Sequence, residues 1–222
     1  MTKDSLLTMA YKNEIVEQMK EEGKKLQQLM SYYKCAIMEI ETKFKVLDEE
    51  YSLQHDRNPI NSIKGRLKKI PSIMEKLERK GYEVSVESIE KNLNDIAGIR
   101  VVCSFEEDVY TLADALLRQD DITLIRKKDY IKEPKVNGYR SLHLIVSVPI
   151  FLNNEKRIMK VEIQLRTIAM DCWASLEHQL RYKKSNKSTE EIERELYECA
   201  MLSTELDERM DQLRDTMIET EV

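Results

Sequence analysis

Apolar residues recur at alternating steps of four and three along two segments of the chain, residues 26–51 and 192–217. This spacing is typical of one face of an α-helix, and it predicts a long helix near each end. A capping box of Ser188 and Glu191 opens the second helix. Both stripes are narrow and backed by charged residues, so each helix needs a partner. That partner is either the core of the same chain or a second subunit, and the pattern leaves both open.

Between these helices the apolar pattern changes from the period of a helix to that of a strand. Asn153 and Asn154 mark a hairpin turn between the last two strands. The pattern predicts strands over 99–105, from 122, over 142–151 and over 157–165, and helices over 106–118 and 168–182. The predicted fold class is therefore α+β, with a small mixed sheet that carries helices on one face and is framed by the two long helices.

These elements divide the chain into three regions. We expect residues 1–54 to form an N-terminal helical arm, residues 55–185 to form the core, and residues 186–222 to form an acidic C-terminal helix for packing or oligomerisation. No apolar run approaches the ~18 residues of a membrane span, and the first ten residues lack the pattern of a signal peptide. The sequence therefore predicts a soluble, cytoplasmic protein.

The charge is distributed unevenly along the chain. The net charge of -5 argues, at face value, against an anionic ligand. Residues 189–222, however, hold twelve Asp or Glu and three Arg, which leaves +4 for residues 1–188. Two basic stretches, residues 57–81 and 126–140, lie within the predicted core. Such runs are often solvated faces, but these also suit the phosphates of a nucleotide.

The first basic stretch, unlike the four cysteines, has the spacing of a binding site. The cysteines lie far apart without the spacing of a metal site, so we expect reduced packing residues. The short helix of the first basic stretch places Ser72, Lys76 and Arg79 on one face, where a hydroxyl and two cations suit a phosphate. Arg66 and Lys68 precede this helix and, being two residues apart, point the same way on an extended segment.

Two carboxylates stand out in the middle of the chain. Asp95 lies in a loop before the first core strand, where Asp is most often a turn former. Glu162 alternates with the apolar residues of the last strand and shares its open face with Gln164. If that face is a ligand floor, two carboxylates from neighbouring strands could hold Mg²⁺ while the ion keeps several waters.

A tyrosine lies between the cations of the second basic stretch. Asn137 and Gly138 predict a turn that projects Tyr139. An aromatic ring in that position can stack on a base while neighbouring cations meet phosphates. A hairpin with an aromatic plug is the equal alternative.

Taken in order, these segments resemble the synthetase domain of the RelA/SpoT family, and most closely its small alarmone synthetases of the RelP type. The similarity covers residues 25–215. The motifs that carry it are H-x-x-N-P-I (55–60), G-R-L-K (65–68), E-K-L-E-R-K-G (75–81), D-I-A-G-I-R (95–100), D-Y-I-x-x-P-K-x-N-G-Y-R-S-L-H-L (129–144), E-I-Q-L-R-T-x-A-M-D (162–171) and W-A-S-L-E-H (173–178).

The resemblance implies a nucleotidyltransferase-like fold and transfer of pyrophosphate from ATP to the 3′-hydroxyl of GTP or GDP, which makes (p)ppGpp in the stringent response. It implies that Asp95 and Glu162 bind Mg²⁺ and that Glu162 also takes the proton of the 3′-hydroxyl. The residues implied around ATP are Arg66, Lys68, Ser72, Lys76, Arg79 and Arg100. Those implied around GTP or GDP are Lys128, Lys135, Tyr139, His143 and Gln164.

The resemblance also implies a homotetramer with no membrane partner and no obligatory nucleic acid. His55 and Asp56 stand without the upstream histidines of the family's hydrolase domain, so we expect no hydrolase activity. Ser62 and Asp171 replace the Phe and Asn of the allosteric site in RelQ-type relatives, so activation by pppGpp is not expected.

Two other functions fit the same residues. A different nucleotidyl transferase with the same two carboxylates would release pyrophosphate instead of AMP. A non-catalytic module that binds nucleotides or RNA would need only the basic stretches. The reaction products and the effect of Glu162→Gln separate the three hypotheses.

Overall fold

A computed structural model describes residues 3–55, 57–182 and 189–220, which include six helices and five strands. Ser188 and Asp56 lie outside the described residues. The capping box at Ser188 and the expected lack of hydrolase activity therefore stay predictions. The elements are α1 (Lys3–His55), β1 (Ile60–Leu67), α2 (Ile70–Arg79), α3 (Val86–Asn92), β2 (Ala97–Cys103), α4 (Glu106–Leu117), β3 (Thr123–Asp129), β4 (Leu142–Phe151), β5 (Lys156–Thr167), α5 (Ile168–Tyr182) and α6 (Thr189–Thr220).

The five strands form one mixed sheet in the order β1-β2-β5-β4-β3. β2 and β5 are parallel, and the other neighbours are antiparallel. The mixed sheet predicted from the sequence is confirmed. The pattern missed β1, because its exposed residues do not alternate regularly with buried ones. No described helix is both long enough and apolar enough to cross a bilayer.

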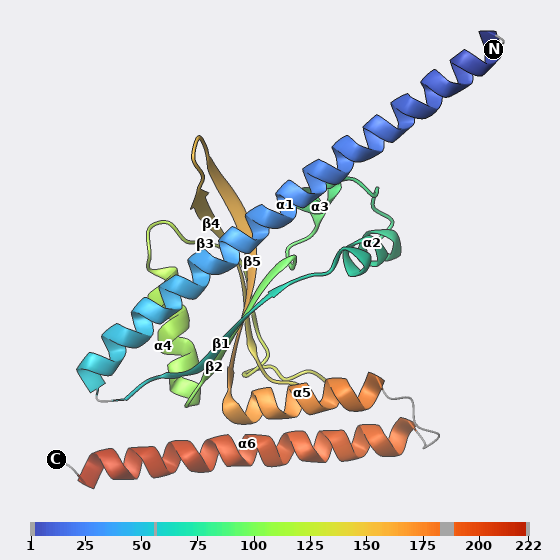
Figure 1. Ribbon diagram of the computed structural model, residues 1–222. Helices are drawn as coiled ribbons and strands as arrows, with labels where there is room; N and C mark the ends of the chain where they lie inside the picture. Colours follow the sequence, from blue (N-terminus) through green and yellow to red (C-terminus); the bar gives the residue numbers. More distant parts are fainter. Residues whose placement is uncertain (1–2, 56, 183–188, 221–222) are drawn as a thin grey trace.

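One face of the sheet is covered by α1 and α4, and the other is open. Figure 1 shows α1 crossing the sheet and extending well beyond it toward the N-terminus. Tyr33, Ile40 and Phe44 of α1 are buried in the same core as Val161 and Ile163 of β5. The first apolar stripe is therefore partnered, over its middle, by the sheet of the same chain. This burial fixes which side of each strand remains available for a site.

The second stripe behaves differently. α6 packs beside α5 at one end of the sheet (Figure 1), where the Trp173 indole Nε1 donates to the carbonyl of Leu196 at 2.8 Å. Beyond Ala200, the residues of α6 that face the rest of the chain are polar, and Asp207 is buried among them. Leu206 and Leu213, which belong to the apolar stripe, are 52% and 58% exposed. The first part of the stripe, around Leu196, is thus covered by α5, but no partner for the part beyond Ala200 is found among the described residues.

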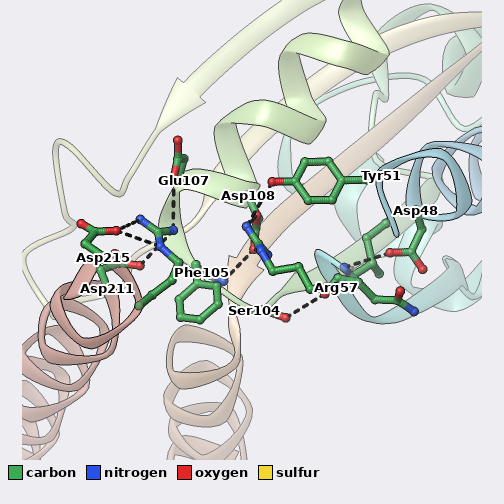
Figure 2. Close-up of polar contacts among 12 residues, drawn as sticks. Asp48, Tyr51, Arg57, Ser104, Phe105, Glu107, Asp108, Asp211 and Asp215 are labelled. Atoms are coloured by element: carbon green, nitrogen blue, oxygen red, sulfur yellow. Dashed lines mark hydrogen bonds and ion pairs between the residues drawn. The ribbon is translucent and has the colours of Figure 1, made fainter. Parts of the chain in front are cut away.

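A polar junction joins the end of α1, the start of β1, α4 and α6 (Figure 2). The Arg57 guanidinium donates to both oxygens of Asp108, at 2.7 and 2.9 Å. Asp108 also accepts from the backbone N–H of Phe105 and so caps α4. The Phe105 ring lies between two guanidinium groups, that of Arg57 at 5.3 Å and that of Arg214 at 5.0 Å. The junction fixes α6 to the core at its C-terminal half.

Candidate active site

The register of the sheet arranges polar side chains in two rows across its open face. Directly paired residues point to the same side of a sheet, so each row crosses all five strands. The first row is Arg66, Gly98, Glu162, Ile145 and Arg126, and the second is Lys64, Arg100, Gln164, His143 and Lys128. Glu162 and Gln164 thus lie at the centre, with cations toward both edges. The open face predicted from the alternation of β5 is confirmed.

Asp95 lies over the edge of this face, in the loop before β2. Its Oδ2 accepts from the ammonium groups of Lys68, at 2.7 Å, and of Lys76, at 2.6 Å. Burial alone would raise the pKa of the Asp95 carboxyl, but the two lysines outweigh it and hold the pKa below its ordinary value. Its other oxygen, Oδ1, is buried without a hydrogen-bond partner. The loop position predicted for Asp95 is confirmed, but the residue does more than form a turn.

Glu162 is the second carboxylate of the site. Its Oε1 lies 3.8 Å from Nδ1 of His143, and its Oε2 accepts from the Gln164 amide at 3.2 Å. Burial would raise the pKa of Glu162, and the charge of Asp95 adds to that rise, but His143 and, less strongly, the Gln164 amide hold the pKa below its ordinary value. Glu162 is therefore ionised at neutral pH and able to accept a proton.

Two hollows meet at these carboxylates, and Asp95 and Glu162 line both. The larger hollow, about 310 Å³, is bordered by Lys76, Lys128, Lys135 and His143, among others. The smaller, about 170 Å³, is bordered by Arg66, Arg100 and Gln164 and has Gly98 on its floor. A side chain at position 98 would point into this space, so the glycine keeps it open. The arrangement offers two binding spaces with acidic groups between them.

A buried arginine connects several of the predicted site residues. Arg166, at the end of β5, donates to the Tyr139 hydroxyl at 2.6 Å and to the Gln164 amide oxygen at 2.8 Å. The Tyr139 hydroxyl lies 2.8 Å from Nε2 of His143. The hydroxyl oxygen accepts from Arg166 and also contacts the His143 ring, so it links the arginine to the side of the ring opposite Glu162. The network thus orients the His143 ring against the carboxylate.

Tyr139 is not a projecting loop tip. Its ring is half-buried, in edge contact with Tyr130 and His143 and 6.4 Å from the Trp173 ring. The Lys135 ammonium lies 4.3 Å from the centre of the Tyr139 ring and 4.7 Å from that of Tyr130. The tyrosine that borders the larger hollow, beside His143, is Tyr130 and not Tyr139. The turn at Gly138 is as predicted, with a φ of 81°, but the ring leans inward.

The remaining predicted residues lie at the border of one hollow or outside both hollows. Ser72 and Arg79 are exposed on α2 and border neither of the two hollows. Lys128 donates to the Tyr130 hydroxyl at 3.1 Å. Arg100 pairs with Asp171 at 3.1 Å, and Asp171 also pairs with Arg166 at 3.2 Å. Asp171 therefore links a residue of the smaller hollow to the network around Tyr139.

The structure brings in two residues that the sequence reasoning did not single out, Arg166 and Tyr130. Arg166 continues the alternation of Glu162 and Gln164 on β5, so extending the predicted strand by one residue would have placed it on the open face. Tyr130 follows Lys128 at the end of β3, and its place beside Lys135 depends on the fold of the loop. No local pattern signals that contact.

The donor set suits a divalent cation with an incomplete protein shell. Among the described residues, no three His, Cys, Asp or Glu side chains gather in a metal-binding group. Mg²⁺ usually takes one or two carboxylates and completes its shell with water and substrate phosphates. The unpartnered Oδ1 of Asp95, close to Glu162 on the wall of both hollows, fits that requirement.

Fold and site together define a nucleotide-handling protein, in which an open sheet face with cations at both edges surrounds two carboxylates. A family model described as a region found in RelA/SpoT proteins matches residues 65–187. The chain belongs to the RelA/SpoT family.

Individual relatives agree with this assignment. The chain is 46% identical to GTP pyrophosphokinase YwaC of Bacillus subtilis over 178 residues, which cover 80% of this chain and 85% of that protein. The crystal structure of small alarmone synthetase 2 from Bacillus subtilis superposes with a TM-score of 0.76 and 42% identity, covering 84% of this chain and 96% of that one. Small alarmone synthetase 1 from the same organism, bound to its product pppGpp, gives 0.74 and 36%, covering 83% and 93%. The similarity extends well beyond the region of the family model, and the fold is that of the small alarmone synthetases.

Proposed function

We propose that this protein is a GTP pyrophosphokinase, which transfers the β,γ-pyrophosphate of ATP to the 3′-hydroxyl of GTP or GDP and releases AMP. The observation that carries the proposal is the pair of carboxylates on the shared wall of two cation-lined hollows. A two-substrate transfer between polyphosphates needs two spaces, cations around them and an acidic group where they meet. The names of the relatives support the same reaction.

The bonds that form and break in this transfer require a proton acceptor and cations around the phosphates. The 3′-oxygen of the acceptor forms a bond to the β-phosphorus of ATP, and the bond from that phosphorus to the α,β-bridging oxygen breaks. The bridging oxygen leaves with the electron pair as part of AMP. Glu162, ionised at neutral pH, accepts the hydroxyl proton. Cations around the phosphates stabilise the charge that develops on their oxygens.

We assign the smaller hollow and the adjoining lysines to ATP, and the larger hollow to the acceptor. The ATP residues are Arg66, Lys68, Ser72, Lys76, Arg79 and Arg100, and the acceptor residues are Lys128, Lys135, Tyr139, His143 and Gln164. Four of these residues border neither hollow, namely Lys68, Ser72, Arg79 and Tyr139. Two others lie across the division. Lys76 borders the larger hollow and Gln164 the smaller, so both lie near the boundary where the phosphates would meet. Arg166 positions Tyr139 and Gln164 for the acceptor.

Mg²⁺ is the proposed cofactor, held by Asp95 and Glu162. When bound, it would neutralise charge on the phosphate oxygens of ATP. Lys68 and Lys76 occupy one oxygen of Asp95 and leave the other available for the ion.

The reaction products provide the test of this function. We expect ATP, GTP and Mg²⁺ incubated with the protein to give AMP and 3′-pyrophosphorylated guanosine in equal amounts, measured by anion-exchange chromatography and mass spectrometry. Chelation with EDTA should abolish both products, and added Mg²⁺ should restore them. Release of pyrophosphate without AMP would favour a different nucleotidyl transferase, and binding without turnover would favour a non-catalytic module.

The ring and the hydroxyl of Tyr139 should contribute separately. Tyr139→Ala removes both and is expected to raise KM for GTP about tenfold or more, since stacking on a base contributes about 1–3 kcal/mol. Tyr139→Phe keeps the ring but removes the contacts to Arg166 and His143. It should leave KM for GTP within about threefold and lower kcat, because His143 loses its orientation. Equal effects of both variants on KM, in steady-state kinetics, would contradict stacking by this ring.

The family subtype and assembly are proposals of the same kind. We propose a small alarmone synthetase of the RelP type, without hydrolase activity, that assembles as a homotetramer through its helical arms. We further propose residues 55–185 as the catalytic region, with residues 1–54 and 186–222 as scaffold. The exposed apolar stripe of α6 supports an interface there. Light scattering would give about four times the chain mass of 26.2 kDa if this is right.

A further inference from the structure

The loop between β3 and β4, residues 130–141, carries Lys135 and Tyr139 and has little regular structure of its own. Within it, the backbone N–H of Gly138 donates to the carbonyl of Lys135 at 2.8 Å, and that of Lys135 donates to the carbonyl of Tyr139 at 3.2 Å. These local bonds shape the turn but do not attach it to the sheet. Contacts from outside hold the loop over the larger hollow. On the side of the sheet, Arg166 donates to the Tyr139 hydroxyl and the Ser141 hydroxyl donates to the carbonyl of Leu165 at 3.1 Å, and two further contacts come from the other side.

One such contact is steric and comes from α6. A Cβ placed on Gly138 would lie 2.4 Å from the Cβ of Ala200, closer than real Cβ atoms approach one another. Gly138 and Ala200 are both buried. The backbone of the loop at Gly138 therefore packs directly against the Ala200 methyl group of α6, and Gly138 has no side chain to separate them. A helix that shifts at this point would move the residue next to Tyr139.

The second contact is a buried charge pair. Arg140, only 8% exposed, donates to Asp207 of α6 at 3.1 Å and to Glu106 of α4 at 2.5 Å. The same Asp207 oxygen accepts from the Thr167 hydroxyl, at the end of β5, at 2.9 Å. Asp207 therefore ties the end of the loop to the strand that carries Glu162. Loss of its charge would leave a buried guanidinium with one carboxylate fewer.

α6 is itself fixed on both sides of Asp207. Toward its N-terminus, Trp173 of α5 holds the carbonyl of Leu196. Toward its C-terminus, Arg214 pairs with Glu107 of α4 at 3.1 Å, beside Asp211 and Asp215 in Figure 2. Asp207 thus acts from a helix that is anchored to the core at two points, so the position of the helix can be transmitted to the loop.

We propose that Asp207 is a positioning residue for the acceptor nucleotide, acting through Arg140 on the loop that carries Lys135 and Tyr139. The proposal rests on the proposed function. It assigns to α6 a part in acceptor binding that its distance from the carboxylates would not suggest.

The test is a kinetic comparison of Asp207→Asn with Glu205→Gln, which makes the same charge change at an exposed position of the same helix. Asn keeps the shape of the side chain and an oxygen for Thr167 but removes the charge. We expect Asp207→Asn to raise KM for GTP about tenfold, the loss of one charge-assisted hydrogen bond, with KM for ATP unchanged and kcat lowered less than about twofold. Glu205→Gln should match the wild type.

A second, uncharged variant addresses the steric contact. Ala200→Val enlarges a buried side chain directly below Gly138, so it should push the loop away and raise KM for GTP in the same selective manner. Melting temperatures identify which variants remain folded. One folded variant is enough to test the positioning role, even if the other variant does not fold.

The kinetic results distinguish a failure of the proposed function from a failure of the positioning role of Asp207. If the wild type makes no product, the proposed function fails. If the wild type is active and KM for GTP stays within about twofold in a folded variant, the positioning role is wrong. Parallel loss of affinity for ATP and GTP, or a fall in kcat alone as expected from a smaller folded fraction, would also overturn it.

Discussion

Glu162→Gln should lower kcat by about a thousandfold while leaving KM for both nucleotides nearly unchanged. Glutamine keeps the size of the side chain, and its oxygen can still accept from the Gln164 amide as Glu162 does at 3.2 Å. It cannot take the proton of the acceptor hydroxyl, and it offers a metal no charge. Initial rates of AMP formation at saturating ATP and GTP measure the effect.

The matched control is Glu155→Gln, the same change in the hairpin turn between β4 and β5, at the far end of the strand that carries Glu162. It should retain the wild-type rate. If Glu162→Gln lowers kcat less than about tenfold, Glu162 is not the base, because a positioned proton acceptor contributes at least about a hundredfold. A rise in KM with kcat preserved would make it a binding residue instead.

Asp95→Asn should lower kcat about a hundredfold and raise the Mg²⁺ concentration needed for half-maximal rate. The contacts of Asp95 add a less obvious expectation. Its carboxylate now neutralises Lys68 and Lys76, at 2.7 and 2.6 Å. Without that charge, the two ammonium groups are free for phosphates, so metal-free ATP should bind more tightly to the variant than to the wild type. Calorimetric titration in EDTA measures this binding, and Asp114→Asn on the exposed side of α4 is the control.

The same variant should show a pH-dependent loss of stability. The pKa of Asp95 is held below its ordinary value of 3.8, so its ionised form contributes stability at neutral pH that disappears as the pH falls through the lowered pKa. We expect Asp95→Asn to lower the free energy of unfolding by about 1–2 kcal/mol at pH 7. The difference should narrow below pH 3.8 in urea unfolding curves. A difference independent of pH would mean that the lysines do not depend on this charge.

The alternation of β5 was the most informative sequence pattern, because one face had to be buried. Once Val161 and Ile163 are assigned to the core, Glu162 and Gln164 must lie on the open face. The buried stripe of α1 follows the same logic. β1 escaped prediction because its edge position leaves every residue except Ile60 at least partly exposed. Its pairing with β2, and not its own composition, makes it a strand.

Contacts between distant segments set the limit of prediction in the site. Tyr139 could be read as a projecting tip or as a plug, and its posture is decided by Arg166, which lies 27 residues away in the sequence. The two apolar stripes look alike in sequence, yet the first is buried over its middle and the second is exposed beyond Ala200. The difference arises because α6 turns Asp207 and Arg214 toward the core, where they pair with Arg140 and Glu107.

The order of the strands has a consequence for the behaviour of the protein in solution. β1 and β3 are the two edges of the sheet, and unpaired edges can recruit strands from other molecules. Lys64 and Arg66 lie on one edge strand, and Arg126 and Lys128 on the other. These cations border the two hollows of the open face, and they also discourage a second sheet from docking edge to edge. The open face thus ends in two charged edge strands, and the charges that border its two hollows also protect it from aggregation.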